Sequence, residues 1–176
     1  GEEYAPTKST GTATGTGTAS FSPDTGALED LTAVNEGDLP EEGKPDLVFP
    51  HGFFSFNITG LKDGQEAIVT ITLPSPAPVG TQYWKHGPTP DNPTPHWYQL
   101  EVGDNDGDNV ITITLVDGGL GDDIVGAPDG KIIDQGGPGN PAPVGGEAHP
   151  VNRTSVLAPW IGLAVLLVGA GAFMIV

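Results

Sequence analysis

The sequence has no cysteine, one methionine, and six Lys and Arg residues against 23 Asp and Glu residues. The lack of cysteine excludes disulfide bonds, thiolate metal sites and a cysteine nucleophile. The shortage of basic residues gives a formal net charge of −17. That charge excludes a nucleic-acid-binding surface, which needs cations to displace counterions, and disfavours docking on anionic lipid head groups. With one methionine and few long helix-forming stretches, a helical bundle is also disfavoured.

Charged residues are missing altogether after Arg153, and residues 156–176 form an almost wholly apolar run. At about 1.5 Å per residue the run spans roughly 30 Å, the thickness of the hydrocarbon core of a bilayer. A buried helix of a soluble protein would show a polar face, and this run has none. Trp160 lies where an interfacial aromatic residue belongs. The sequence therefore predicts a single transmembrane helix over residues 155–176, in contact with lipid.

Short segments of alternating apolar and polar residues fill the part of the chain before this run. They are separated by turns rich in Gly, Pro and Asp, a pattern typical of an antiparallel β-sandwich. The expected strands cover residues 18–21, 28–34, 53–59, 67–73, 81–85, 96–100, 109–116 and 131–133. We expect the sandwich over residues 17–135. A Thr/Gly-rich arm or edge strand precedes it at 1–16, and a Gly/Pro linker follows at 136–154.

Four stretches resemble the choice-of-anchor U domain family of prokaryotic surface proteins. They are residues 49–61, 67–74, 83–98 and 115–138, and residues 83–98 read YWKHGPTPDNPTPHWY. The similarity covers roughly residues 15–140. The resemblance implies an exported domain placed just before one of several interchangeable C-terminal anchors. It implies no catalytic activity.

Two acidic clusters are candidate calcium sites, because Ca²⁺ prefers carboxylate and carbonyl oxygen ligands. The first is Asp104, Asp106 and Asp108, with carboxylates at alternate positions, although its spacing departs from an EF-hand loop. The second cluster lies along a Gly-rich loop and comprises Asp117, Asp122, Asp123, Asp129 and Asp134. The alternative is a hairpin turn between residues 99–102 and 109–116 for the first cluster, and a solvated acidic loop for the second.

The remaining chemistry-bearing residues give no catalytic pattern. His51, His86, His96 and His149 lack a zinc-ligand spacing, although His86 and His96 flank one proline-rich loop. No Gly-x-Ser-x-Gly elbow and no phosphate-binding loop are present, so we expect no enzyme. The aromatic residues of segment 83–98 are predicted to cap one end of the sandwich. The alternative is a carbohydrate-binding platform of aromatic rings.

Two N-glycosylation sequons occur, at Asn57 and Asn152. If Phe54, Phe56 and Ile58 point into the core, Asn57 points outward, as a glycosylation site requires.

Together these patterns predict a membrane-anchored, non-catalytic structural or interaction protein of the cell envelope. An acidic domain before a C-terminal span is typical of a single-pass protein whose N-terminal part lies outside the cell. Surface-layer or other membrane proteins are the expected partners. One alternative is an accessory subunit whose single helix docks on a larger membrane complex, and a second is a carbohydrate-binding surface module.

Overall fold

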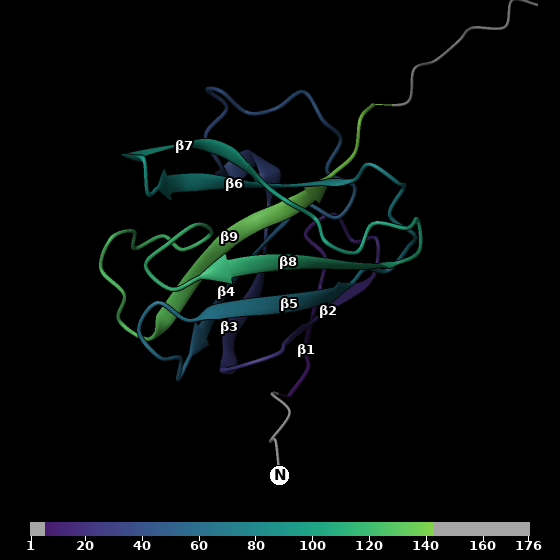
Figure 1. Ribbon diagram of the computed structural model, residues 1–176. Helices are drawn as coiled ribbons and strands as arrows, with labels where there is room; N and C mark the ends of the chain where they lie inside the picture. The colour runs from purple at the N-terminus through teal and green to yellow at the C-terminus, as the bar shows by residue number, and fades with distance from the viewer. Residues whose placement is uncertain (1–5, 143–176) are drawn as a thin grey trace, which may run out of the picture. The chain divides into compact units, whose positions relative to one another are not determined.

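The computed structural model describes residues 6–142, which form two antiparallel β-sheets (Figure 1). A short 3₁₀-helix, η1, covers Glu36–Asp38. The strands are β1 Lys8–Gly11, β2 Thr18–Pro23, β3 Ala27–Val34, β4 Phe53–Thr59, β5 Glu66–Thr72, β6 Gln82–Thr89, β7 Asn92–Leu100, β8 Val110–Val116 and β9 Lys131–Gly139. The predicted all-β class with two antiparallel sheets is therefore confirmed.

The four-stranded sheet has the order β1-β2-β5-β8, and the five-stranded sheet has the order β3-β4-β9-β6-β7. The last strand, β9, thus lies between β4 and β6 rather than at an edge; it is the light green arrow in Figure 1. Thr59 pairs with Lys131 at one end of the β4–β9 ladder, and Lys85 pairs with Gly136 on the β6 side. The chain after β9 therefore continues from the middle of a sheet.

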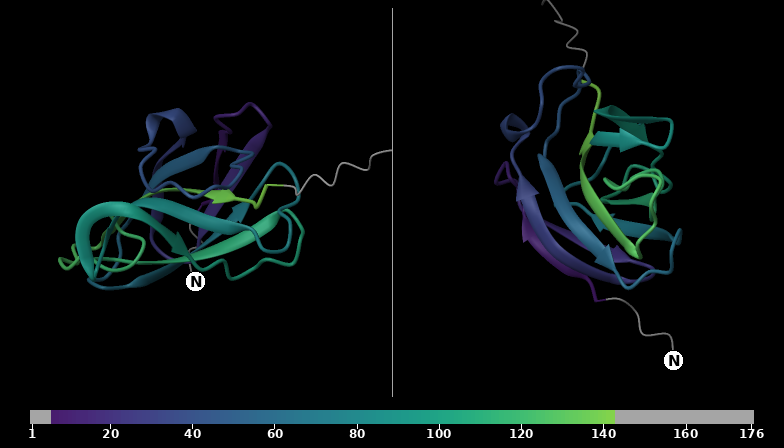
Figure 2. Two further views of the ribbon diagram at one scale, coloured as in Figure 1. Left: turned by 90° about the horizontal axis from the view of Figure 1, so that it is seen from above. Right: turned by 90° about the vertical axis from the view of Figure 1, so that its left-hand side faces the viewer.

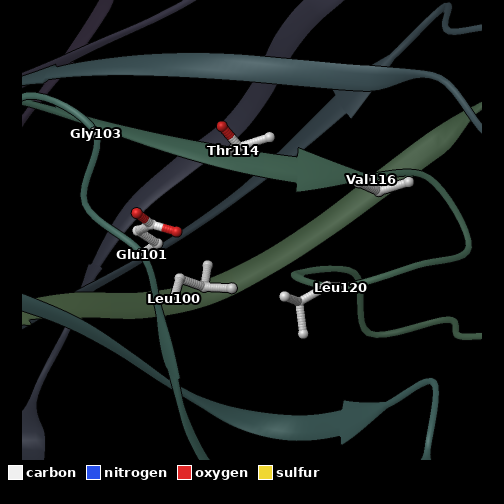
Figure 3. A pocket seen from close by; sticks show the side chains of 6 residues that line it. All are labelled: Leu100, Glu101, Gly103, Thr114, Val116 and Leu120. Carbon is white, nitrogen blue, oxygen red and sulfur yellow. The ribbon is translucent and has the colours of Figure 1, made fainter.

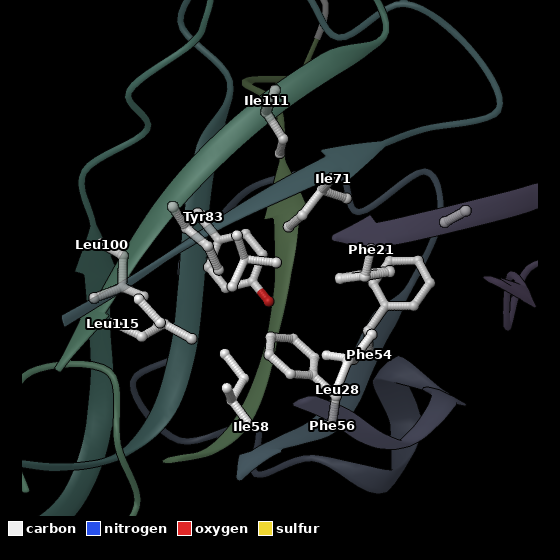
Figure 4. Packing of buried hydrophobic residues seen from close by; sticks show 14 of the residues in the cluster. Phe21, Leu28, Phe54, Phe56, Ile58, Ile71, Tyr83, Leu100, Ile111 and Leu115 are labelled. Atoms are coloured by element: carbon white, nitrogen blue, oxygen red, sulfur yellow. The ribbon is translucent and has the colours of Figure 1, made fainter. Parts of the chain in front are cut away.

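The main hydrophobic core lies between the inner faces of the two sheets (Figure 4). Alternation along each strand directs every second side chain inward. In β4 the inward side chains are Phe54, Phe56 and Ile58, each at most 1% exposed. Phe21 of β2 packs against the rings of Phe54 and Phe56, with centroid separations of 5.0 and 5.4 Å.

A second, smaller cluster covers the outer face of the five-stranded sheet. Its buried members are Leu39, Phe49, Phe53 and Trp97. The Phe49 and Phe53 ring centroids are 4.4 Å apart, and Trp97 Nε1 donates a hydrogen bond to the Pro40 carbonyl at 2.9 Å. The acidic segment 35–52 is therefore packed onto the sheet. Figure 2 shows its 3₁₀-helix η1 on the outside of the fold.

The eight predicted strands are all present, although the bounds of all but β4 differ from expectation. The Thr/Gly-rich segment at 1–16 contributes an edge strand, since β1 pairs with β2. The supposed proline-rich loop between residues 85 and 96 is largely a hairpin of β6 and β7. Its Pro93 and Pro95 lie in β7, an edge strand, where a residue without an N–H group is tolerated.

The predicted linker from residue 136 is wrong in its first four residues, which belong to β9. Glycine is needed there because atoms of neighbouring segments lie too close to the strand to leave room for a Cβ. A Cβ on Gly137 would lie 2.7 Å from the Gly52 carbonyl oxygen, and one on Gly139 would lie 2.7 Å from the Phe49 ring. The compact unit ends at Ala142.

The alternative given for the first acidic cluster, a hairpin turn between residues 99–102 and 109–116, is present only in part. β7 belongs to the five-stranded sheet and β8 to the four-stranded sheet, and only the Val102–Ile113 bridge joins the segments. The chain crosses from one sheet to the other at this point. Within residues 6–142 no helix is long and apolar enough to cross a membrane, and the expected span at 155–176 lies outside the described residues.

Candidate functional site

A fully buried lysine is the most unusual feature of the inner face of the five-stranded sheet. In β6 the alternation directs Tyr83 and Lys85 inward, and both are 0% exposed. Asp134 of β9, also 0% exposed, faces the same interior in line with the core residue Ile132. The loop after β8 closes over these side chains and contributes Asp123. Two strands and one loop thus form a polar cluster inside an apolar core.

The Lys85 ammonium group has three oxygen neighbours. Its Nζ lies 2.7 Å from Asp134 Oδ1, 2.7 Å from the Gly121 carbonyl oxygen and 3.5 Å from Asp123 Oδ1. The other Asp134 oxygen, Oδ2, accepts a hydrogen bond of 2.9 Å from the Tyr83 hydroxyl group. Both oxygens of Asp134 are therefore engaged.

Two buried atoms in and beside the cluster have no hydrogen-bond partner: Asp123 Oδ1, and Oη of Tyr98, which pairs with Lys85 across the β6–β7 hairpin. Asp123 lies at the edge of the cluster, because about a third of its side chain (32%) is exposed while Oδ1 faces inward. Buried polar atoms without partners are uncommon in native proteins and cost free energy. Their presence beside an ion pair marks this cluster as a site that packing alone does not explain.

Burial and mutual charge shift the proton affinities of the cluster. Burial lowers the pKa of Lys85, but the nearby Asp134 charge opposes it, and the pKa is raised overall. Burial raises the pKa of Asp123, although the Lys85 charge acts in the opposite direction. Burial also raises the pKa of Tyr98 to about 12 and that of Tyr83 well above its ordinary value. The two tyrosines therefore remain hydrogen-bond donors at neutral pH.

Two glycines make room for the cluster. Gly136 pairs with Lys85 across the β6–β9 ladder, and a Cβ there would collide with Tyr83 Cε1 and lie 2.8 Å from Lys85 Cγ. A Cβ on Gly87 would lie 3.0 Å from Asp123 Oδ1. The lysine side chain can therefore lie flat across β9 to reach Asp134, two residues before its paired position.

The loop of residues 117–130 is held by two buried carboxylates. Asp117, 1% exposed, accepts hydrogen bonds from the backbone N–H groups of Gly64, Asp129 and Gly130 at 2.9–3.1 Å. Burial raises its pKa, but these hydrogen bonds outweigh that effect and lower the pKa overall.

Asp122 also holds this loop through backbone N–H groups, at a point closer to Lys85. It is 0% exposed and accepts N–H groups of Gly118, Ile124 and Ile133 at 2.9–3.2 Å. Asp122 thereby fixes the loop that carries Gly121 and Asp123 over Lys85.

The members of the second predicted calcium cluster are therefore engaged separately. Asp117 and Asp122 bind backbone groups, Asp123 and Asp134 lie beside Lys85, and Asp129 Oδ1 accepts the N–H group of Lys131 at 3.1 Å. Calcium binding by this cluster stays a prediction. A bound ion would replace the backbone donors that Asp117 and Asp122 now accept.

The first predicted calcium cluster forms a chain of local turns. Asp106 Oδ1 accepts the N–H group of Asp108 at 3.0 Å, and Asp108 Oδ1 accepts that of Val110 at 2.6 Å. The Asp104 N–H group donates to Thr112 Oγ1. Among residues 6–142 no three His, Cys, Asp or Glu side chains converge as metal ligands would.

The histidines within the described part of the chain lie in separate surroundings. His51 is buried, and its Nδ1 and Nε2 lie 2.9 and 3.3 Å from the hydroxyl oxygens of Thr16 and Ser75. Burial lowers its pKa. His86 pairs with Trp97 across the hairpin while His96 pairs with Gly87, so the two imidazoles lie on opposite faces of the sheet.

The aromatic side chains of segment 83–98 pack on both faces of the five-stranded sheet. Tyr83 and Tyr98 belong to the main core. Trp97 belongs to the second cluster, and Trp84 packs against that cluster. Tyr98 and Trp97 are each only 8% exposed. The rings are buried as packing residues are, but they lie on the two faces of one sheet rather than at one end of the sandwich as predicted.

Asn57 lies on the face of β4 opposite to Phe54, Phe56 and Ile58, as expected for an outward side chain. Its Nδ2 donates to Asp30 Oδ2 at 2.7 Å. Asp30 lies at a β-bulge and has a positive φ of 53°. The second predicted glycosylation site, Asn152, and His149 lie outside the described residues.

A pocket of about 360 Å³ opens between the end of β7 and strand β8 (Figure 3). Leu100, Val116 and Leu120 give it an apolar lining, and Glu101 and Thr114 provide its polar side chains. No pair of these side chains forms a nucleophile and a base.

Sequence reasoning missed Lys85, although a signal was present. Lys85 lies two residues after the inward Tyr83 on one strand, and Asp134 lies two residues after the inward Ile132 on another, so both point inward. A cation and an anion at core positions of two strands suggest an ion pair, because an isolated buried charge is too costly.

Comparisons with protein-family models, with curated proteins and with solved structures give no match.

Proposed function

We propose that the chain is a membrane-anchored, outside-facing β-sandwich with a structural or interaction role in the cell envelope. The observation that carries this proposal is the uncharged apolar run of residues 156–176 behind a strongly acidic domain. In the proposal, residues 155–176 cross the bilayer once and contact lipid, and residues before 155 lie outside the cell.

Three features of the described domain support a role without catalysis. Lys85, Asp134 and Tyr83 are fully buried, the pocket beside β8 has a largely apolar lining, and the described histidines are separate. The resemblance to the choice-of-anchor U family suggests the same arrangement, a folded exported domain followed by an anchor. Interaction with surface-layer or other membrane proteins is the proposed use of the acidic surface.

Membrane extraction of the full chain tests the anchor. Produced with an export signal, the protein should stay in the membrane pellet through alkaline carbonate and dissolve only in detergent. Leu166→Arg should release it, because a charge at the centre of a span costs about 2.5–3.5 kcal/mol. Leu166→Ile is the matched control. Release of the unaltered chain by carbonate would overturn the proposal.

Orientation and partners need separate measurements. Protease added to intact cells should digest residues before the span, and protection of these residues would contradict the outside location. Purification in mild detergent then separates two roles. Migration as a free protein fits an independent surface component, whereas co-migration with a defined complex would favour the accessory subunit.

A further inference from the structure

We propose that Lys85 and Asp134 join covalently, as an amide bond between Lys85 Nζ and Asp134 Cγ that cross-links strands β6 and β9. The two side chains are in contact at 2.7 Å, and both are 0% exposed. No external substrate can reach the amine, so the chemistry open to it is with its own neighbours. Among them, Asp134 offers an electrophilic carboxyl carbon.

The reaction is a condensation that needs no oxidant or added reactant. Within the ion pair one proton passes from the Lys85 ammonium group to the Asp134 carboxylate, and the free amine then attacks Cγ of the neutral Asp134 carboxyl group. The tetrahedral intermediate then loses one oxygen as water. One N–C bond forms and one C–O bond breaks, and the lysine and aspartate together lose one water molecule.

The neighbours of the pair are suited to the steps of this reaction. The Gly121 carbonyl accepts a hydrogen bond from Nζ and orients the amine. Asp123 Oδ1, 3.5 Å from Nζ and otherwise without a partner, can take the second proton, which the nitrogen releases after its attack, and pass it to the departing oxygen. The Tyr83 hydroxyl group donates to Asp134 Oδ2 and stabilises the charge that develops there.

The surroundings favour the amide over the ion pair. Two reacting groups held in contact behave as if present at very high concentration, with effective molarities of roughly 10⁵ to 10⁸ M in well-oriented systems. Both charges disappear on condensation, which removes the penalty of keeping ions in an apolar core. The raised pKa of Asp123, caused by burial, helps this side chain hold the transferred proton. The partly exposed Asp123 also lies where a released water can leave.

The bond would fix the strand from which the chain leaves the sandwich. Any pull on residues after 142 acts first on β9, which is joined to β4 and β6 by backbone hydrogen bonds, side-chain packing and the Lys85–Asp134 ion pair, all non-covalent. A covalent link from position 134 to position 85 would carry that load into β6. The bond forms inside the domain and does not depend on membrane attachment.

Mass spectrometry of the purified full chain tests the bond directly. The intact mass should be lower than the sequence mass by one water molecule. Trypsin should fail to cleave after Lys85 and should release residues 63–131 joined to residues 132–153 as one branched product. Complete cleavage after Lys85, with peptides of unmodified mass, would overturn the proposal.

Two controls exclude other causes of water loss. Aspartate before glycine, as at Asp63 and Asp106, can lose water by forming a succinimide, but hydroxylamine cleaves that product and does not yield a branched peptide. Lys85→Arg keeps the charge and cannot form the bond under these conditions, so it should show the full sequence mass. Persistent water loss in Lys85→Arg would count against the assignment. Asp123→Asn should leave the two segments unjoined, and unimpaired joining would refute the role of Asp123.

Discussion

At the residue scale, the fold buries an ion pair at two positions beside the main core, where apolar side chains would be expected. Taking a carboxylate and an ammonium group out of water costs several kcal/mol per ion, and attraction repays that only when every hydrogen bond is made. Lys85 and Asp134 meet this condition through Gly121 and Tyr83. Asp123 and Tyr98 do not, which is why the cluster calls for a chemical explanation.

The buried carboxylate of Asp117 should make the free energy of unfolding depend on pH in the acid range. Its folded pKa is lowered, because hydrogen bonds from three backbone N–H groups outweigh the effect of burial. The stabilisation is therefore present above the unfolded pKa, near 3.8, and is lost as pH falls through the lower folded pKa. We expect Asp117→Asn to cost about 2 kcal/mol at pH 7, since it loses charged hydrogen bonds. The cost should shrink below about pH 4.

Urea unfolding at several pH values measures this difference. Asp46→Asn, which removes the same charge at an exposed position, is the matched control and should change stability little. An equal cost of Asp117→Asn at pH 3 and pH 7 would show that ionisation of Asp117 does not contribute.

Gly136 gives a steric prediction. An alanine there would place its Cβ against Tyr83 Cε1, 2.8 Å from Lys85 Cγ and 3.0 Å from the Trp84 carbonyl oxygen. Because a backbone atom cannot move aside cheaply, we expect Gly136→Ala to lower the free energy of unfolding by about 3 kcal/mol. Gly11→Ala, with nothing within 4 Å of its new Cβ, is the control. Equal urea midpoints for the two variants would contradict the crowding.

At the element scale, the alternation of apolar and polar residues predicted every strand that has a continuous apolar face. It failed where glycine or proline stands in place of the apolar residues. Strand β4 shows the rule, with Phe54, Phe56 and Ile58 buried as expected. The end of β9 shows the failure, since Gly136, Gly137 and Gly139 resemble a linker. Their role depends on the rings of Tyr83 of β6, Phe53 of β4 and Phe49 in the segment before β4. No local pattern reports such contacts.

One side chain of the sheet, Trp97, makes both a packing contact and a hydrogen bond that hold the acidic segment 35–52. Trp97 packs on Phe53, with ring centroids 5.7 Å apart, and bonds the Pro40 carbonyl. We expect Trp97→Phe to cost about 1–2 kcal/mol, because the carbonyl loses its buried partner. The Val48 amide, which bonds the Asn140 carbonyl, should exchange its hydrogen faster.

Hydrogen exchange followed by NMR separates this effect from general loosening. Trp84→Phe is the control, because Trp84 Nε1 bonds Gln82 on the same strand and not the acidic segment. Core amides of β5 should keep their exchange rates in both variants. Unchanged exchange at Val48 in Trp97→Phe would show that the segment is held by other contacts.

At the scale of the whole molecule, the charge of −17 works against the compact state. Like charges repel across the surface, and salt screens them over about 10 Å at 0.1 M ionic strength. We therefore expect the Tm of the full chain in detergent to rise with ionic strength. The same rise would follow from any salt, so it must be separated from the calcium binding that the sequence predicts.

Melting curves in NaCl, MgCl₂ and CaCl₂ at matched ionic strength make that separation. The oxygens of Asp117 and Asp122 already accept backbone donors, and Asp134 is bound to Lys85 and Tyr83. We therefore expect the curves for Ca²⁺ and Mg²⁺ to coincide. A larger shift in Ca²⁺, reversed by chelator, would contradict this and establish a calcium site. Loss of that extra shift in Asp104→Asn, but not in the exposed control Glu42→Gln, would assign it to the first acidic cluster, since only specific ligation distinguishes two variants of equal charge.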